Sequence, residues 1–315
     1  MLKRIVLLSF ILTIVGASSF AQSDNINTSK FKQLREDLPT PNSYRTASGA
    51  PGHEYWQQKA DYKIHMTLDD ANTKMMGEET ITYHNQSPDA LSYLWLQLDQ
   101  NMRAKDSNTH ATGTSAAREK LSIGQIKRMN PDFDGGFKIQ KVTDSSGRAL
   151  KYTINKTMMR IDLPNTLKSG ERYIFNVKWW YNINNTREIG GRSGYENFAE
   201  DDNNVYCIAQ FFPRMCAYND VEGWQNKQFL GRGEFALVFG DYDVRLTVPS
   251  DHLVASTGEL INADDVLSKD QLKRLKQAEK ESVQPVIIAS KEEADVRMTG
   301  KATDTKTWHF KAANV

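Results

Sequence analysis

Tyr62-Lys63-Ile64-His65-Met66-Thr67-Leu68 is the stretch of this 315-residue chain that decides its fold class. Apolar side chains occupy every second position from Tyr62 to Leu68, and polar or charged side chains occupy the positions between them. Successive side chains of a β-strand point to opposite faces. The alternation therefore predicts a strand with one face in a core and the other in water.

The same two-residue period recurs along the chain between short turn sequences. One segment, Leu91–Leu98, is instead almost continuously apolar, which is typical of a strand covered on both faces. The further strands predicted in this way cover residues 79–83, 91–98, 159–163, 173–179, 242–248, 286–288 and 308–310. Many short strands divided by turns favour an antiparallel, mainly β domain, and the strand–helix–strand alternation of a parallel sheet is missing.

One helix is predicted near the end of the chain, over residues 268–281. Ser268 is a suitable N-cap, and Gln271 follows three residues later, which is the spacing of a capping box. Leu267 can pack on Leu272 as a hydrophobic staple. The helix surface is mostly charged, so we expect a solvated surface helix inserted between strands.

The first 21 residues resemble an export signal. Lys3 and Arg4 precede an apolar run over residues 5–15, and the small residues around Ser19-Phe20-Ala21 form a plausible cleavage site. The alternative, a membrane anchor, needs about 20 apolar residues, and this run is shorter. We expect export to the periplasm or the outside of the cell without a stable membrane anchor. Residues 22–52 then form a polar leader before a β domain over 53–315.

The overall composition excludes one class of partner. Lys and Arg number 40 against 39 Asp and Glu, which leaves a formal net charge of +1. A protein that binds nucleic acid usually carries a basic surplus, so we expect no nucleic-acid partner. The apolar share of 39% is enough to build a core, which argues against wholesale disorder.

Two cysteines, Cys207 and Cys216, allow two interpretations. An exported protein permits a disulfide, and the spacing of the two cysteines suits the two arms of a β-turn or hairpin. Alternatively, both are small hydrophobic residues in the core. Their spacing is not that of a Cys-x-x-Cys redox or zinc motif.

The chain contains six histidines, and none of them completes a zinc motif. The helical motif His-Glu-x-x-His places two ligands one turn apart beside a general-base Glu. His53-Glu54 begins this pattern, but Gln57 stands where the second histidine is required. A Gly-x-Ser-x-Gly elbow and a phosphate-binding loop are also missing from the sequence. We therefore predict that this chain has no catalytic residue, no metal ligand and no cofactor of its own.

A series of motifs in the second half of the chain resembles one family of enzymes. The motifs span residues 210–215 (Gln210-Phe211-Phe212-Pro213-Arg214-Met215), 218–224, 230–235, 239–249 and 254–260. In this order they resemble the segment that precedes the catalytic domain in exported bacterial zinc aminopeptidases of the aminopeptidase N family. Leu94-Trp95-Leu96-Gln97-Leu98 resembles an early strand of the same family.

The resemblance implies a saddle-shaped, antiparallel, β-sandwich-like N-terminal domain. It also implies a partner, a thermolysin-like catalytic domain that holds the zinc ion and lies beyond the end of this chain. Without that domain the chain would hydrolyse no peptide, because positioning a substrate without a metal-activated water lacks the chemical step. The alternative function is a stand-alone exported β module that binds peptide or protein.

The resemblance further implies one substrate-binding residue, Gln210. The family's N-terminal domain lends the active site a Gln or Glu that receives the free α-ammonium of the peptide substrate, and Gln210 stands at the matching position. An amide oxygen suits this role, because an ammonium group offers only donors. We also expect Phe211, Phe212 and Trp224 to form an exposed apolar surface toward the catalytic domain.

Overall fold

A computed structural model describes residues 41–112, 120, 122–124, 126, 131–200, 202–231, 233, 236–281 and 283–315. The predicted signal peptide at 1–21 and the leader as far as residue 40 lie outside the described residues. The end of the leader contacts the domain through Arg45, whose Nε and Nη2 donate to the two carboxylate oxygens of Asp220 at 2.7 and 2.8 Å.

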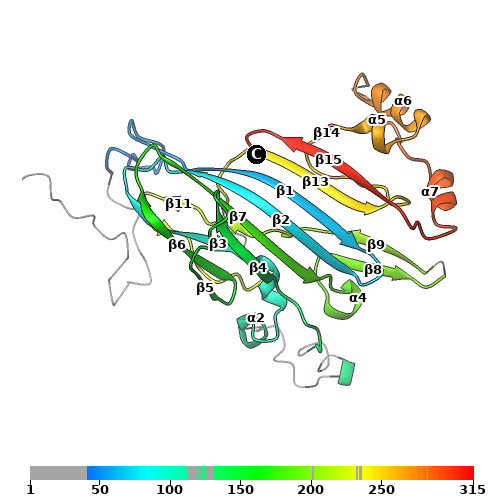
Figure 1. The fold of residues 1–315 in the computed structure, drawn as a ribbon, viewed down its shortest axis with the longest axis horizontal. Coiled ribbons are helices and arrows are strands. Elements are labelled where there is room, and N and C mark those ends of the chain that lie inside the picture. The colour runs from blue at the N-terminus through cyan, green and yellow to red at the C-terminus, as the bar shows by residue number, and fades with distance from the viewer. Residues whose placement is uncertain are drawn as a thin grey trace, which may run out of the picture.

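The main feature of the fold is a seven-stranded sheet (Figure 1). Its strands in spatial order are β14 (Glu259–Leu260), β15 (Thr305–Ala312), β13 (Tyr242–Pro249), β1 (Lys59–Asp69), β2 (Lys74–His84), β7 (Arg172–Asn182) and β4 (Lys138–Asp144). The neighbouring strands are antiparallel, except that β1 and β13 run parallel. The mainly β fold is confirmed, but the sheet is mixed. The chain forms the intervening strands after β2 and then returns as β13, which pairs with β1 in the parallel direction.

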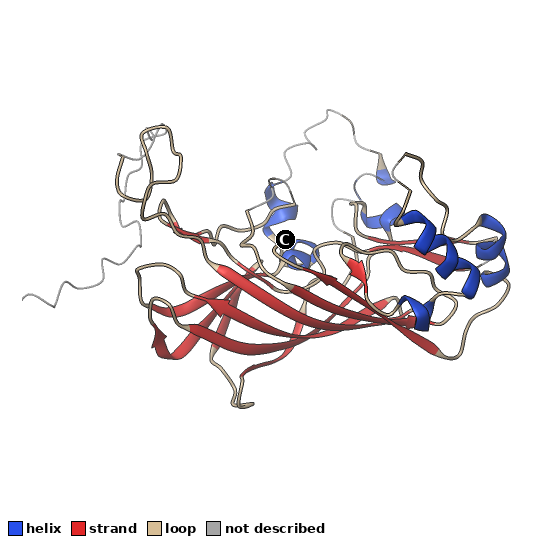
Figure 2. Ribbon diagram, turned by 90° about the horizontal axis from the view of Figure 1, so that it is seen from above, coloured by secondary structure: helices blue, strands red, loops and turns tan. Residues whose placement is uncertain are grey.

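The smaller sheets are formed by the part of the chain between β2 and β13. A four-stranded sheet has the order β10 (Arg214–Met215), β3 (Leu91–Gln97), β6 (Met158–Leu167) and β5 (Tyr152–Asn155). Two hairpins pair β8 (Gly194–Phe198) with β9 (Asn203–Cys207), and β11 (Tyr218–Asn219) with β12 (Gly223–Trp224). The hairpins and the four-stranded sheet lie on one face of the large sheet (Figures 1 and 2).

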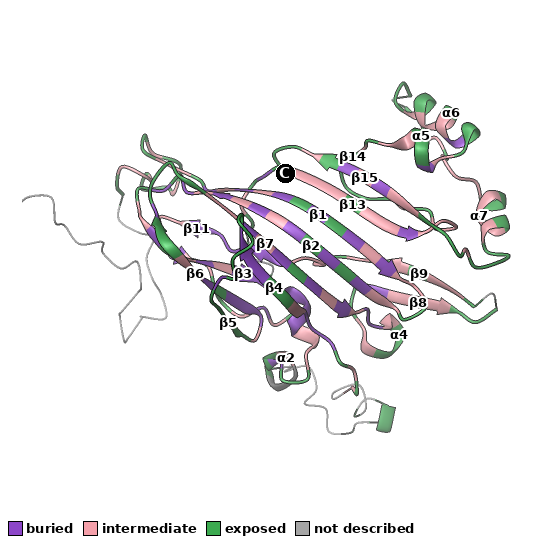
Figure 3. Cartoon of the chain, viewed as in Figure 1, coloured by how far each residue is buried: buried purple, intermediate pink, exposed green. Residues whose placement is uncertain are grey.

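The core forms where the inward-facing side chains of the large sheet meet the smaller sheet. In β1 the side chains of Tyr62, Ile64, Met66 and Leu68 are buried and those between them are not, as the alternation predicts (Figure 3). On β3, Leu94 and Leu96 are fully buried, while Tyr93 and Trp95 on the other face are half-buried. Apolar burial of this kind contributes about 25 cal/mol per Å² and is the main stabilising term of such a fold.

Two core positions of β2 do not carry apolar side chains, and each has a distinct physical setting. Gly77 is required by close packing, because a Cβ there would come within 2.2 Å of the Trp179 ring. Glu79 is buried, and within the described residues neither carboxylate oxygen has a hydrogen-bond partner. Burial away from water raises the pKa of the Glu79 carboxyl well above its usual value and so favours its neutral form.

The helices of the described residues are short and gather on the side of the large sheet that carries the smaller sheets (Figure 2). They are η1 (Asp99–Arg103), α2 (Asn108–Thr112), α4 (Thr186–Ile189), α5 (Ala263–Val266), α6 (Lys269–Ala278) and α7 (Lys291–Arg297).

The helix predicted at 268–281 is confirmed as α6, which begins after Ser268 and is three residues shorter at its end. Ser268 Oγ accepts from the Gln271 backbone N–H, and Gln271 Oε1 accepts from the Ser268 N–H, as the capping-box spacing predicts. The prediction of a single helix is wrong, because α7 follows with a second capping box at Ser290 and Glu293. The strand predicted at 286–288 is not formed, whereas 308–310 lies within β15.

Candidate functional site

The candidate site is the loop over residues 208–213, which connects β9 to β10. Gln210 lies at the centre of this loop with a φ of +53°, in the left-handed region. Such a φ is uncommon for a residue other than glycine and costs free energy unless the surrounding structure holds it in place.

Two side chains from outside the loop hold its backbone. Gln100 of η1 is buried, and its Nε2 donates to the carbonyl oxygens of Ala209 and Gln210 at 3.2 and 3.0 Å. Ser193 Oγ donates to the Ala209 carbonyl at 3.1 Å and accepts from the Ala209 N–H at 3.0 Å. The main-chain groups beside Gln210 are therefore satisfied, and the left-handed turn is stabilised from two directions.

The orientation of the Gln100 amide is determined by a third contact. Arg103 Nη1 donates to Gln100 Oε1 at 3.1 Å, so the amide must present its NH₂ group to the loop. Arg103 is itself withdrawn from water, and this burial lowers the pKa of its guanidinium below the usual value. Sequence reasoning missed Gln100; the only signal was the polar Asp99-Gln100-Asn101 triplet directly after an apolar strand.

A buried ion pair fixes the far end of the loop. Arg214 of β10 places Nε 2.6 Å from Asp99 Oδ2 and donates from Nη2 to Asp99 Oδ1 at 3.1 Å. The side chains of Arg214 and Asp99 are only 10% and 0% exposed. Gln97 Nε2 also donates to Asp99 Oδ1. One short helix, η1, therefore positions both the loop backbone, through Gln100, and the strand that follows it, through Asp99.

The side chain of Gln210, unlike those of Gln100 and Ser193, does not hold the loop in place. It is half-buried, and within the described residues its amide makes no hydrogen bond. The expectation that Phe211 and Phe212 are exposed is wrong, because both are half-buried and Phe212 packs edge-on against Tyr62 with ring centroids 5.2 Å apart. Trp224 is likewise half-buried and packs on Tyr218 at 5.0 Å. The rings therefore form a packed wall beside the half-buried Gln210 side chain.

Both cysteines are free thiols in this structure. Cys207 is exposed at the end of β9, whereas Cys216 is buried just after β10. Burial raises the pKa of the Cys216 thiol, so this group remains protonated and unreactive. The disulfide is therefore not formed here, and the description as a buried hydrophobic residue fits Cys216 but not Cys207.

The residues that the structure describes include no cluster of three or more His, Cys, Asp or Glu side chains that could hold a metal ion. The histidines instead pair locally. His84, His252 and His309 lie against Asp61, Asp251 and Asp243, and His65 lies against Thr247. None of the helices in the described part of the chain is long and apolar enough to cross a membrane.

Comparisons with known proteins give likenesses in structure only. No protein-family model matches the chain. No curated protein matches it. Among solved structures, the chain is similar to an M1 zinc metallopeptidase from Deinococcus radiodurans, as a variant bound to a Tyr-Ser-Ala substrate, with 12% identity and a TM-score of 0.39 over 81% of this chain and 39% of that chain.

A second solved structure is a two-domain M1 zinc metallopeptidase variant bound to L-tryptophan, with 12% identity and a TM-score of 0.39 over 83% of this chain and 41% of that chain. The chain thus spans well under half the length of these structural neighbours. TM-scores and identities this low do not by themselves establish membership of a family.

Proposed function

We propose that this chain is the non-catalytic N-terminal β domain of an exported zinc aminopeptidase. In this proposal the domain packs on a thermolysin-like catalytic domain outside these 315 residues. The zinc ion and its activated water, when bound in that domain, supply the hydrolytic step. The order of the motifs over residues 210–260 supports the proposal from the sequence.

The observation that carries the proposal is the geometry of the loop at Gln210. A polar side chain without a hydrogen bond in the described residues stands on a left-handed backbone, and other polar groups satisfy the main chain around it. An uncommon backbone conformation that long-range contacts maintain is typical of functional positions. In this proposal the Gln210 side chain is available to a ligand and does not stabilise the fold.

Gln210 has the chemistry to anchor the free amino terminus of a peptide. Its amide oxygen accepts from an α-ammonium group, which offers donors only. A hydrogen bond to a charged group contributes about 1.5–3 kcal/mol, roughly twice the value for a neutral pair. Because the Gln100 and Ser193 contacts already order the loop, little conformational entropy would be lost when a substrate binds.

The proposed function is tested by the full product of the reading frame that contains this chain. We expect a His-Glu-x-x-His motif downstream of Val315 and zinc-dependent release of the first residue from peptides with a free amino terminus. Matched peptides with an acetylated amino terminus should not be cleaved. A reading frame that stops at Val315, or equal cleavage of the acetylated peptides, would contradict the proposal.

A further inference from the structure

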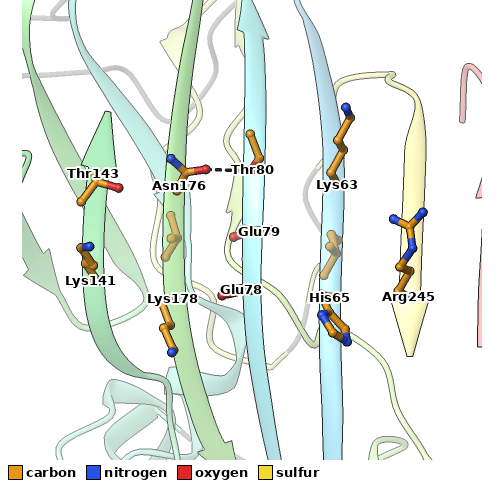
Figure 4. Close-up of a pocket in the computed structure, with 12 residues that line it drawn as sticks. Lys63, His65, Glu78, Glu79, Thr80, Lys141, Thr143, Asn176, Lys178 and Arg245 are labelled. Carbon is orange, nitrogen blue, oxygen red and sulfur yellow. Dashed lines mark hydrogen bonds between the residues drawn. The ribbon is translucent and has the colours of Figure 1, made fainter. Parts of the chain in front are cut away.

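The outer face of the seven-stranded sheet, opposite the smaller sheets, carries a band of basic side chains (Figure 4). Strand register places one exposed residue from each of several neighbouring strands in a continuous row. From one side of the sheet to the other, the row is Lys141, Lys178, Glu78, His65 and Arg245. Lys63 lies one step along β1 beside this row. We name these six residues the outer band.

The outer band lines a shallow groove of about 480 Å³. Strands are spaced about 4.8 Å apart, so the five strands of the row span about 19 Å, enough for an extended ligand that crosses them. Arg245 is partly neutralised by Asp243, to which its Nη1 donates at 2.9 Å. Lys63, Lys141 and Lys178, in contrast, form no ion pair within the described residues, although Asp243 and Glu78 are the direct cross-strand partners of Lys63 and Lys178.

The arrangement of two of these lysines is itself unfavourable. Lys141 and Lys178 are direct cross-strand partners of β4 and β7, and both are exposed on the same face. Like charges directly opposite each other destabilise a sheet. Glu78, directly opposite Lys178 on its other side, offsets part of this repulsion, and a bound anion between Lys141 and Lys178 would offset the rest.

We propose that the outer band binds an acidic peptide segment that lies across the strands. Carboxylate side chains complement the unpaired lysines. Glu78 interrupts the band, and Asp243 lies beside it; a uniformly charged phosphate backbone would be repelled there, whereas a peptide can place a neutral or basic residue at those points.

This inference does not depend on the proposed function, because the outer band lies on the face of the sheet opposite the loop at Gln210 and can be tested without a catalytic domain. The near-neutral net charge of the chain gives no sign of the outer band, because acidic residues elsewhere balance its basic side chains. The band would supply a second contact for a protein or peptide that the chain engages.

The test uses fluorescence anisotropy of the full chain with a labelled hexaglutamate peptide. A triple variant, Lys63→Gln with Lys141→Gln and Lys178→Gln, should weaken binding about tenfold, since an exposed ion pair contributes about 0.2–1 kcal/mol. The matched control changes Lys273, Lys276 and Lys280 of the α6 region to Gln, which removes the same charge from another lysine cluster and should alter binding less than about twofold. Glu78→Gln should strengthen binding.

Raising the salt concentration from about 20 to 150 mM should weaken hexaglutamate binding, and hexaglutamine should not bind. Equal weakening by the two triple variants would overturn the proposal, because the attraction would then follow net charge alone. Tighter binding of polyphosphate or of anionic lipid vesicles than of hexaglutamate would also overturn it in favour of those ligands. Melting curves identify any variant that fails to fold. If the triple variant does not fold, the Glu78→Gln variant decides: stronger hexaglutamate binding supports the proposal, and unchanged or weaker binding overturns it.

Discussion

The loop at Gln210 and the helices between residues 263 and 297 are stabilised in opposite ways. The loop depends on partners far away in sequence: Gln100 lies 110 positions from Gln210, and Asp99 lies 115 positions from Arg214. Helices α6 and α7 depend on partners three positions away, at Ser268–Gln271 and Ser290–Glu293. The loop at Gln210 therefore requires the folded domain, whereas the helices carry their own start signals.

Removing the buried partner of the loop should give the largest effect. Asp99→Ala leaves the Arg214 guanidinium buried and unpaired, and breaking a buried ion pair in this way typically costs about 3–5 kcal/mol. Urea denaturation should show a loss of this size in the free energy of unfolding.

A double variant and a surface control separate this cause from a general loss of packing. Asp99→Leu combined with Arg214→Met removes both charges, so it should be clearly more stable than Asp99→Ala. Asp132→Ala removes a solvent-exposed partner of Lys105 and should leave the denaturation midpoint unchanged. A double variant as unstable as the single one would show that the ion pair is not what holds η1 to β10.

The next largest effect concerns substrate binding rather than stability. Gln210→Ala in the enzyme joined to its catalytic domain removes an acceptor that faces a charged donor, a change of about 1.5–3 kcal/mol. This corresponds to a fall in kcat/KM of about 10- to 150-fold for substrates with a free amino terminus. Gln210→Glu should retain activity, because a carboxylate also accepts from an ammonium group.

The Gln210→Ala variant also distinguishes a substrate-binding role of this side chain from a structural role. Since the Gln210 amide makes no hydrogen bond within the described residues, Gln210→Ala should change the melting temperature little, as should the exposed control Gln140→Ala. Gln100→Ala, in contrast, should lower the melting temperature, because two carbonyl groups lose their donor. A large fall in melting temperature with unchanged kinetics would show that Gln210 belongs to the scaffold.

A smaller, pH-dependent effect is expected from Glu79, whose carboxylate has no hydrogen-bond partner among the described residues. Its carboxyl has a higher pKa in the folded chain than in the unfolded chain, so folding takes up a proton above the usual pKa near 4.5. The free energy of unfolding should therefore fall as pH rises from about 4.5 toward the raised pKa, by at most about 1.4 kcal/mol per pH unit from this group. Glu79→Gln should remove this contribution in urea titrations at successive pH values. A slope identical in the two proteins would contradict it.

The sequence predicts what depends on local period and local caps. Alternation located β1, β7 and β13, and Ser268 with Gln271 located the start of α6. The parallel pairing of β1 with β13 could not be predicted, because register between strands almost 180 residues apart is a property of the whole fold. The segment 286–288 has strand-like side chains but lies in an irregular connection between α6 and α7, because a local pattern does not specify a pairing partner.

The same division applies to the candidate site. The motif around Gln210 predicts it as a substrate-binding residue, because the neighbouring residues carry the resemblance. The left-handed backbone at Gln210 and the roles of Gln100 and Ser193 were not predicted, because side-chain contacts over such separations leave no periodic signal. The outer band was missed for a related reason: its residues come from separate strands, and only the register brings them into one row.

The smallest effect is expected from the locally stabilised region. Ser268→Ala removes the N-cap of α6, and losing such a cap costs about 1 kcal/mol. Because α6 is a surface helix, this loss should appear as local opening rather than as unfolding of the sheet. Hydrogen exchange of the backbone amides in 269–278 should become about fivefold faster. Ser290→Ala should do the same for α7 alone.

The decisive observation is where exchange does not change. If the helices and the loop are stabilised independently, Ser268→Ala should leave exchange in residues 208–213 at its original rate, and Gln100→Ala should accelerate 208–213 while leaving 269–278 unchanged. Faster exchange in both segments of either variant would mean that the two regions open together. The contrast between local and long-range stabilisation would then describe one cooperative unit, and the loop would owe its shape to the whole domain rather than to η1 and Ser193.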